Sequence, residues 1–264
     1  MNLLRLSNLG PADVRGIWRL VASPAKRMTG TVAWSFEGNG IRTRTTFLQA
    51  FRALGLAFTE LPNFLKTAER PRDLAGYLDS FYDMYVIRET NHARLTEFAA
   101  ATRRPVINAM SSEGHPCEVL TDAYYIDTEV IPLERARICL WGPPANVFRS
   151  WHELAGVLDF SIIHVCEARF HQVVPNVTFQ ESPPPAADVV ITDSWPGGTE
   201  ASAWALTEEH LGLMGEPRLL PTPPFSIGRE LSFDPLAYPG FVGYGQKELL
   251  LPVQMAILRY AAEG

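Results

Sequence analysis

The sequence predicts an α/β protein built on parallel sheets. Short runs rich in β-branched and aromatic residues alternate with helix-like segments along the 264 residues. Strands buried on both faces form continuous apolar runs, and parallel strands need helical crossovers between them. A hydrophobic content of 47% is enough for a sizeable core. The predicted strands are TVAWSF (31–36), MYVIR (84–88), PVINAM (105–110), ARICLWG (136–142), SIIHVC (161–166) and ADVVITD (187–193).

The first predicted strand is followed by a glycine-containing turn and a helix. Segment 42–55, RTRTTFLQAFRALG, carries apolar residues at helical spacing and stops at Gly55. We expect this helix to be the first crossover. A second helical region, from His115 to about Val130, precedes IPLERARICLWG, which would begin a second α/β unit. The domain boundary is therefore predicted near 130.

The end of the chain, GQKELLLPVQMAILRYAAEG, is mostly helical in pattern. Pro252 is expected to begin or kink the last helix, because proline has no backbone N–H to donate inside a helix.

The stretch FEGNGIRTRTTF (36–47) predicts an anion site. It places Arg42 and Arg44 at the start of a predicted helix, where the macrodipole repels cations. An anion held by the unpaired N–H groups of the helix start would offset that repulsion. Arg42 could then bind two phosphate oxygens through its planar guanidinium, while Thr43 and Thr45 could add hydroxyl donors. The alternative is a surface helix start with solvated arginines.

Composition excludes several function classes. The net charge of -6 and the mixed charges, 20% of residues, argue against a nucleic-acid surface or a disordered tail. No run of about 18 apolar residues and no signal-peptide pattern is present, so no membrane partner is expected. Cys117, Cys139 and Cys166 form no CxxC pair, which disfavours a disulfide framework or a zinc site. These features fit a cytoplasmic protein.

The first half of the chain resembles the aspartate/ornithine carbamoyltransferase family. The family's S-T-R-T-R phosphate motif matches residues 40–44, Gly-Ile-Arg-Thr-Arg. An arginine that ends a strand in the family matches Arg88 in VIRETNH, and the H-P-x-Q sequence matches His115 to Glu118 in GHPCE.

The second half continues the resemblance in the same order. WGPPANVFRS matches the turn whose asparagine holds an amino-acid acceptor, here Asn146, and VVITDSW matches the segment with an acceptor-binding aspartate, here Asp193. LLPTPP, which includes Pro223, lies where the family has H-C-L-P or H-P-L-P. GQKELLLPVQMAIL is similar to the closing helix of the family.

The resemblance implies two parallel-sheet αβα domains. Residues 1–130 would bind carbamoyl phosphate, with the C-terminal helix, about 246–264, packing back on them. Residues 131–245 would form a Rossmann-like domain for the amino-acid acceptor. The family also implies a homotrimer that needs no metal or organic cofactor.

The resemblance also assigns roles to single residues. Arg42 and the turn formed by Gly40, Ile41 and Arg44 would hold phosphate. Arg88 would bridge phosphate and carbonyl, while Thr43 and His115 would donate to the carbonyl oxygen. The structural alternatives are a solvated strand-end Arg88 and a locally hydrogen-bonded His115 at a helix start. Asn146 and Asp193 could instead cap a turn and a loop.

Several positions depart from the family. Gly40 and Ile41 replace the serine and threonine of the phosphate motif, so two hydroxyls are missing. Glu118 replaces the glutamine that receives the carbamoyl NH2, and Gln254 replaces an arginine of the closing helix. Residues 196–199, Pro-Gly-Gly-Thr, stand in place of the S-M-G loop of ornithine enzymes, which argues against ornithine as the acceptor.

Two further residues have weaker assignments. Lys66, in LPNFLKTAERP, falls roughly where family members send a polar side chain into a neighbour's site, although the alignment is loose there and we favour a solvated loop lysine. Cys117 lies two positions from His115, and residues two apart on a helix do not face each other, so we do not assign it as a nucleophile.

Three functions are compatible with these residues. The leading hypothesis is a carbamoyltransferase-like enzyme that moves a carbamoyl group from carbamoyl phosphate to an amino-acid-like acceptor other than ornithine. The second is a repurposed family member acting on another phosphorylated or amidine-bearing intermediate in specialised biosynthesis. The third is a noncatalytic homologue that binds anions. The retained residues Arg42, Thr43, Arg88 and His115 disfavour the third hypothesis.

Overall fold

The computed structural model describes residues 1–195 and 204–263. The chain divides into two compact units: unit 1 comprises Met1–Thr121 and Leu249–Gly264, and unit 2 comprises Asp122–Glu248. The division falls inside helix α5 (Pro116–Tyr125), between Thr121 and Asp122, ahead of the position near 130 expected from the sequence. The helix continues as a wider π-helical turn over Ile126–Val130, so the predicted helical region is present while the compact units separate earlier.

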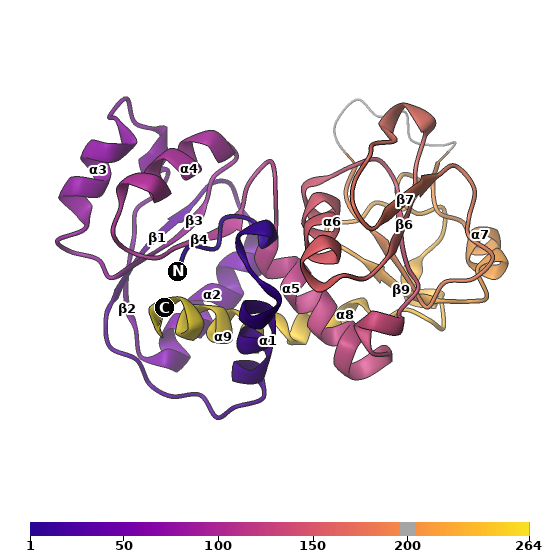
Figure 1. Cartoon of the computed structure of the whole chain (residues 1–264), viewed down its shortest axis with the longest axis horizontal. Coiled ribbons are helices and arrows are strands. Elements are labelled where there is room, and N and C mark those ends of the chain that lie inside the picture. Colours follow the sequence, from indigo (N-terminus) through magenta and orange to yellow (C-terminus); the bar gives the residue numbers. More distant parts are fainter. Residues whose placement is uncertain (196–203, 264) are drawn as a thin grey trace. The chain divides into compact units, whose positions relative to one another are not determined.

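Unit 1 contains a parallel sheet in the order β2-β1-β3-β4. Its strands are β1 (Thr31–Phe36), β2 (Ala57–Glu60), β3 (Met84–Arg88) and β4 (Val106–Met110). Its helices are α1 (Pro11–Val21), α2 (Ile41–Leu54), α3 (Pro71–Leu78), α4 (His92–Ala101), most of α5, and α9 (Leu250–Glu263). Figure 1 shows α3 and α4 on one side of this sheet and α1, α2 and α9 on the other.

The predicted crossover helix α2 has the expected packing. Phe47 and Phe51 are one turn apart, and their rings lie 5.6 and 5.5 Å from the indole of Trp34 on β1. All three side chains are fully buried, so the apolar stripe of α2 covers one face of the sheet. Gly55 ends the helix with a φ of +75°, a left-handed conformation that glycine adopts without strain.

Unit 2 contains a parallel sheet in the order β7-β6-β5-β8-β9. Its strands are β5 (Ile138–Trp141), β6 (Ile162–Val165), β7 (Val177–Gln180), β8 (Val189–Thr192) and β9 (Arg218–Pro221). Its helices are α6 (Asn146–Leu158), α7 (Glu208–Leu213) and α8 (Gly243–Glu248). The prediction of an α/β fold with parallel sheets is confirmed.

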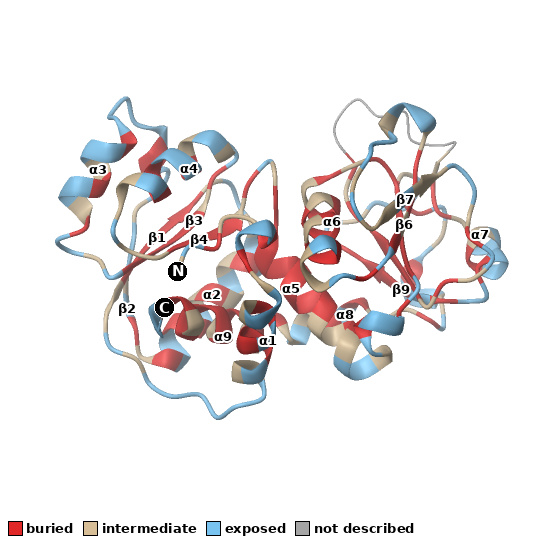
Figure 2. Cartoon of the chain, viewed as in Figure 1, coloured by how far each residue is buried: buried red, intermediate tan, exposed pale blue. Residues whose placement is uncertain are grey.

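Every strand predicted from the sequence is present, but β2, β7 and β9 were missed. All three lie at sheet edges. Strands β2 and β7 are largely exposed or half-buried, as Figure 2 shows for β7, so they lack a continuous apolar run. Strand β9 is a four-residue strand that runs directly into a proline-rich segment, which hides its pattern.

The C-terminal helix α9 belongs to unit 1 and packs against α1 and α2. Pro252 lies in its first turn, where a missing N–H leaves no helical hydrogen bond unmade, so the expected helix start is confirmed. Within the described residues, no helix is long and apolar enough to cross a membrane.

Candidate active site

The predicted anion site lies at the carboxyl edge of the unit 1 sheet. Strand β1 ends at Phe36, and after a short turn helix α2 begins at Ile41. Gly40 precedes the helix with a φ of +32° and accepts a hydrogen bond from the Arg44 N–H through its carbonyl, 2.9 Å away. The first N–H groups of α2 are therefore directed at the turn. We call residues 40–43 together with Arg88 the anion cradle.

The ring of Phe36 brings Gly40 and two arginines together. The guanidinium carbons of Arg44 and Arg88 lie 5.0 and 5.1 Å from the centre of this ring. A Cβ atom on Gly40 would lie 2.1 Å from the Phe36 ring and 2.9 Å from Arg88 Nη1. Arg88 is thus beside the N-terminus of α2, because Phe36 and Arg88 pair as the last residues of neighbouring parallel strands.

Arg44 was expected to help hold phosphate, but its side chain pairs with a carboxylate. Its Nη1 lies 2.5 Å from Oε1 of Glu60, the last residue of β2. The Glu60 carboxylate offsets the repulsion between the Arg44 cation and the N-terminal end of the helix dipole, so this arginine does not need a bound anion. Arg42 is exposed on the first turn of α2, which makes it the arginine of the motif that we assign to the anion.

The threonines of the motif differ from one another. The Thr45 hydroxyl donates to the Ile41 carbonyl at 2.7 Å, and its donation to an anion stays a prediction. Thr43 is buried on the first turn of α2, one turn ahead of Phe47. Ile41 is 69% exposed, so its side chain leaves the turn open to solvent.

Arg42→Ala should weaken the binding of inorganic phosphate by more than about tenfold, because charge-assisted bonds to phosphate are among the stronger hydrogen bonds in proteins. Isothermal titration calorimetry measures this directly. Arg52→Ala is the matched control, since Arg52 is exposed at the opposite end of the same helix. Equal affinity in the two variants would remove Arg42 from the cradle.

Arg88 is more than half-buried and lies beside a carboxylate. Burial lowers the pKa of its guanidinium, and the nearby charge of Glu37 acts in the opposite direction. An arginine stays protonated under such a shift. Its charge is therefore available to an anion at neutral pH.

His115 and Glu118 lie at the start of α5, which follows β4 at the same edge of the sheet. Both side chains are buried. The turn before them is held by Ser111, whose N–H donates to the Gly114 carbonyl at 2.9 Å, and by Asn108, which donates to Ser111 Oγ at 3.1 Å. These bonds position His115 where the helix begins.

The Cys117 thiol has low reactivity. Burial raises the pKa of its thiol, and the neighbouring Glu118 carboxylate raises it further. Its Sγ points to the Asn108 carbonyl, 3.5 Å away. A thiol that resists ionisation is a poor nucleophile, in agreement with leaving Cys117 out of the catalytic set.

Lys66 lies in a short 3-10 turn (Phe64–Lys66) after β2. Its Nζ is 2.6 Å from Glu89 Oε1 and 3.2 Å from Glu37 Oε1. Lys66 therefore pairs with two carboxylates of its own chain, while its side chain stays partly exposed; a role in a neighbour's site stays a prediction.

Gln254 lies in the first half of α9 and is almost fully buried. Among the described residues, no donor reaches its side-chain oxygen. Gln254 stays a candidate on its position in the sequence alone.

In unit 2, Asn146 and Asp193 follow neighbouring strands. Trp141 and Thr192 pair at the carboxyl ends of β5 and β8, so both candidate residues lie at one edge of the sheet. The Oδ1 atoms accept bonds from the next N–H along the chain, at 2.9 Å for Asn146 and 2.8 Å for Asp193. These bonds are those expected for the alternative roles of Asn146 in a turn and Asp193 in a loop.

Pro223 follows β9 at the same edge, and its peptide bond to Pro224 is cis. Ser194 Oγ donates to the Pro224 carbonyl, which ties this loop to the segment that begins at Asp193. Residues 196–199, which replace the loop of ornithine enzymes, lie outside the described residues.

A buried histidine pair supports the turn before Asn146. His164 Nε2 lies 2.8 Å from the Gly142 carbonyl, so it carries the proton and donates. Its Nδ1, 3.1 Å from His152 Nε2, then accepts. Burial lowers the pKa of His152 to about 3 and that of His164 to about 4; the charges of Arg149 and His171 act in the same direction.

Unfolding free energy should therefore fall as the pH drops from about 6.5 towards 4. The unfolded chain binds protons on both histidines in this range, whereas the folded chain does not, and each group contributes up to about 1.4 kcal/mol per pH unit. Urea titrations across this range measure the slope. His152→Gln should flatten it, and His171→Gln, which removes only a charge near His164, should change it much less.

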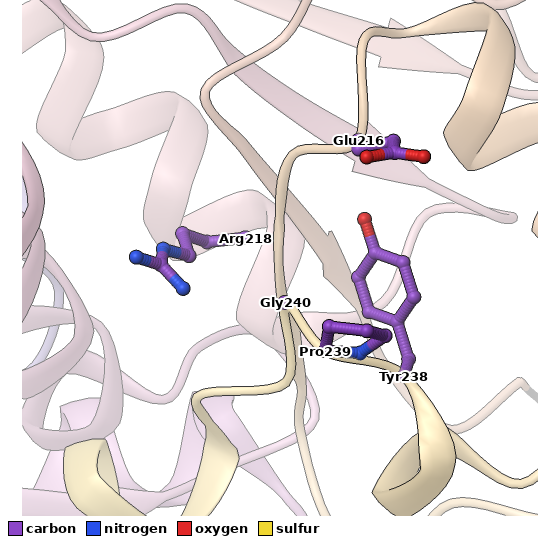
Figure 3. Close-up of a pocket in the computed structure, with 5 residues that line it drawn as sticks. All are labelled: Glu216, Arg218, Tyr238, Pro239 and Gly240. Atoms are coloured by element: carbon purple, nitrogen blue, oxygen red, sulfur yellow. The ribbon is translucent and has the colours of Figure 1, made fainter.

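A small hollow lined by Gly142, Pro143 and Cys166, among others, lies at the same edge as Asn146 and Asp193. Two other hollows on unit 2 lie away from these residues. One of about 220 Å³ is lined by Glu216, Arg218, Tyr238, Pro239 and Gly240. Figure 3 shows the Tyr238 hydroxyl towards Glu216, with Arg218 pointing away. Arg218 begins β9, so this hollow lies at the amino edge of the sheet, opposite Asp193. We do not assign it to the candidate active site.

Sequence reasoning missed Phe36, Glu37 and Glu89. Each lies at or directly after the end of a central strand, where parallel α/β proteins gather their ligand-binding groups. Their position at the end of a central strand was the signal by which the sequence could have identified them. Their contacts with arginines and Lys66 depend on strand order, which the sequence did not show.

Comparisons with known proteins agree with the fold and the motifs. The sequence model of a family described as "Aspartate/ornithine carbamoyltransferase, carbamoyl-P binding domain" matches residues 12–128. The ornithine carbamoyltransferase of Oleidesulfovibrio alaskensis is 27% identical over 256 residues, 87% of this chain and 85% of that one. That of Agrobacterium fabrum is 34% identical over 167 residues, 58% of this chain and 54% of that one.

A solved structure has the same fold. The ornithine carbamoyltransferase from Pyrococcus furiosus superposes with a TM-score of 0.90 at 21% identity, covering 100% of this chain and 97% of that one. The two-sheet architecture described above is therefore that of a known group of enzymes.

Proposed function

Because the chain belongs to the aspartate/ornithine carbamoyltransferase family, we propose that it transfers a carbamoyl group from carbamoyl phosphate to the amine of an amino-acid-like acceptor. The observation that supports this most is the convergence of Gly40, the start of α2 and Arg88 around Phe36. This arrangement provides N–H donors and a cation at one edge of unit 1, within the range matched by the carbamoyl-phosphate domain.

The reaction makes one bond and breaks another. The acceptor nitrogen attacks the carbonyl carbon, the C–N bond forms, the bond from carbon to the bridging phosphate oxygen breaks, and the amine loses a proton. In our proposal Arg42 and the α2 N–H groups hold the leaving phosphate, and Arg88 faces both phosphate and carbonyl. Thr43 and His115 would donate to the oxyanion. Loss of one such donor typically raises the barrier by about 3 kcal/mol.

We propose that the acceptor is an amino acid or a similar amine other than ornithine, although the relatives compared above are named ornithine carbamoyltransferases. The support is the sequence at 196–199, Pro-Gly-Gly-Thr, which departs from the ornithine-type loop. In this proposal Asn146 and Asp193 bind the acceptor from the carboxyl edge of the unit 2 sheet, and Pro223 shapes that edge.

Phosphate release from carbamoyl phosphate, measured across a panel of amines and amino acids, tests the function. We expect release that depends on one class of amine and that exceeds release with ornithine. The absence of amine-dependent release with every member of the panel would refute carbamoyl transfer.

Among the positions that differ from the family, Glu118 bears most on whether carbamoyl phosphate is the substrate that donates the carbamoyl group. An ionised carboxylate only accepts hydrogen bonds, whereas the glutamine of the family also donates. The Glu118 side chain is buried. In a closed and dry site, a carboxyl group that stayed protonated would imitate glutamine. Both forms can accept from the carbamoyl NH2.

Glu118→Gln should preserve or raise turnover of carbamoyl phosphate, because it restores the family residue at the same size and removes a charge that opposes the phosphate. Steady-state kinetics and a thermal melt of the variant measure the effect. A loss of more than about a hundredfold with folding and phosphate affinity intact would show that the carboxylate pairs with a cation. That outcome would favour the second candidate, a reaction on an amidine-bearing or other cationic intermediate.

We also propose a cytoplasmic homotrimer. The cysteines Cys117, Cys139 and Cys166 are free and buried, which suits a reducing compartment. The trimer is an expectation from the family, and cyclic assembly is a common form of enzyme organisation. Light scattering at micromolar concentration tests it.

A further inference from the structure

The loop that carries Lys66 is fixed to its own chain at several points. The Arg94 guanidinium, on α4, donates to the carbonyls of Leu65, Thr67 and Glu69, the last two at 2.8 and 2.6 Å. Phe64 and Leu65 are buried in the core cluster that also contains Tyr85 and Phe98. The loop after β2 is thereby held over the carboxyl edge of the sheet.

Lys66 joins two strand ends at that edge. Glu37 directly follows β1 and Glu89 directly follows β3. Glu37 Oε2 accepts a hydrogen bond from the Thr90 N–H at 2.6 Å, and Glu89 Oε1 accepts one from the Asn91 N–H at 2.9 Å. Backbone groups therefore orient both carboxylates independently of Lys66. Lys66 Nζ then lies within 3.2 Å of both.

The cluster is charged and adjoins the anion cradle. Glu89 is only 3% exposed, Glu37 30% and Lys66 42%. Glu37 belongs to the same turn as Gly38 and Gly40, and its backbone N–H donates to the Arg88 carbonyl at 3.0 Å. Burial raises the pKa of Glu37, but the bonds from Thr90 and Lys66 bring it below the ordinary value, so the carboxylate is charged at neutral pH. The bond to Glu89 raises the pKa of Lys66.

We propose that Lys66 is a positioning residue for the anion cradle of its own chain, which offsets part of the negative charge of Glu37 and Glu89 so that these carboxylates compete less with an arriving phosphate for Arg88. The proposal rests on the proposed function, because it requires that the cradle binds phosphate. It is an alternative to the expectation that Lys66 serves a neighbouring subunit's site.

The physical reason is charge balance. With Lys66 present, the two carboxylates are offset by Lys66 and Arg88. Without Lys66, two negative charges would compete with phosphate for Arg88, and one of them would be buried and poorly screened by water. Phosphate affinity should then fall even though Lys66 does not touch the anion.

Isothermal titration of inorganic phosphate tests this with full-length protein. We expect Lys66→Met to weaken binding by about tenfold or more, and the triple variant Lys66→Met with Glu37→Gln and Glu89→Gln to return to within about threefold of the unchanged protein. Lys66→Arg should retain most of the affinity. Arg70→Met is the control, because Arg70 lies at the end of the same loop and pairs with Asp73, 2.7 Å away on the surface.

Each result has a distinct meaning. A Lys66→Met protein that binds phosphate as tightly as the Arg70→Met control overturns the proposal. A triple variant as weak as the single one also overturns it, because it would make Lys66 a direct ligand of the anion. Failure of the unchanged protein to bind phosphate at all would instead refute the cradle and the proposed function. Thermal melts of every variant establish that each is folded.

Discussion

Replacing Arg88 by methionine should lower kcat/KM for carbamoyl phosphate by about a hundredfold to a thousandfold, the range seen when one donor to a developing oxyanion is removed. Arg88 is the cation at the end of β3, and its Nη1 lies 2.9 Å from where a Cβ on Gly40 would be. In the proposed reaction it faces both the departing phosphate and the carbonyl, so its loss affects the transition state directly. Methionine keeps much of the apolar length of the side chain.

Arg44→Met is the matched control for this prediction. Arg44 also lies over the Phe36 ring, at 5.0 Å, but its guanidinium is bound to Glu60. We expect Arg44→Met to lower kcat/KM by much less, with any effect accompanied by a lower melting temperature. Equal losses in the two variants would mean that packing on Phe36, and not a charge aimed at the substrate, accounts for the effect.

Replacing Gly40 by alanine should abolish phosphate binding within the measurable range, a loss of more than about a hundredfold. The new Cβ would overlap the Phe36 ring at 2.1 Å and displace Arg88. The backbone at Gly40 also has a φ of +32°, and this left-handed conformation costs a residue with a side chain about 1–3 kcal/mol. Phosphate calorimetry and a thermal melt measure the two effects separately.

Gly38→Ala provides the control for backbone strain. Gly38 also has a positive φ, +70°, but a Cβ there would have no atom within 4 Å. We therefore expect Gly38→Ala to lower stability with little change in phosphate affinity. Phe36→Ala combined with Gly40→Ala should recover part of the lost affinity, because it removes the overlapping ring. If Gly38→Ala and Gly40→Ala weaken phosphate equally, the close fit of Gly40 against Phe36 has no role.

The sequence by itself determined the parallel α/β class, the central strands and the helix α2 that stops at Gly55. These features are local: a continuous apolar run or a helical period can be detected without knowing what packs against it. The positions of Arg42, Arg88, His115 and Glu118 at strand ends and helix starts were predicted for the same reason. The edge strands β2 and β7 were missed because their exposure removes the apolar run.

Only the tertiary structure decided which charges meet. Arg44 pairs with Glu60 because β2 lies beside β1, and Lys66 crosses from the loop after β2 to the ends of β1 and β3 because the sheet order is β2-β1-β3-β4. A sequence shows that a lysine and two glutamates exist, but their distances depend on contacts between segments far apart in the chain. Burial then sets how strongly these charges act, since desolvation depends on everything packed around them.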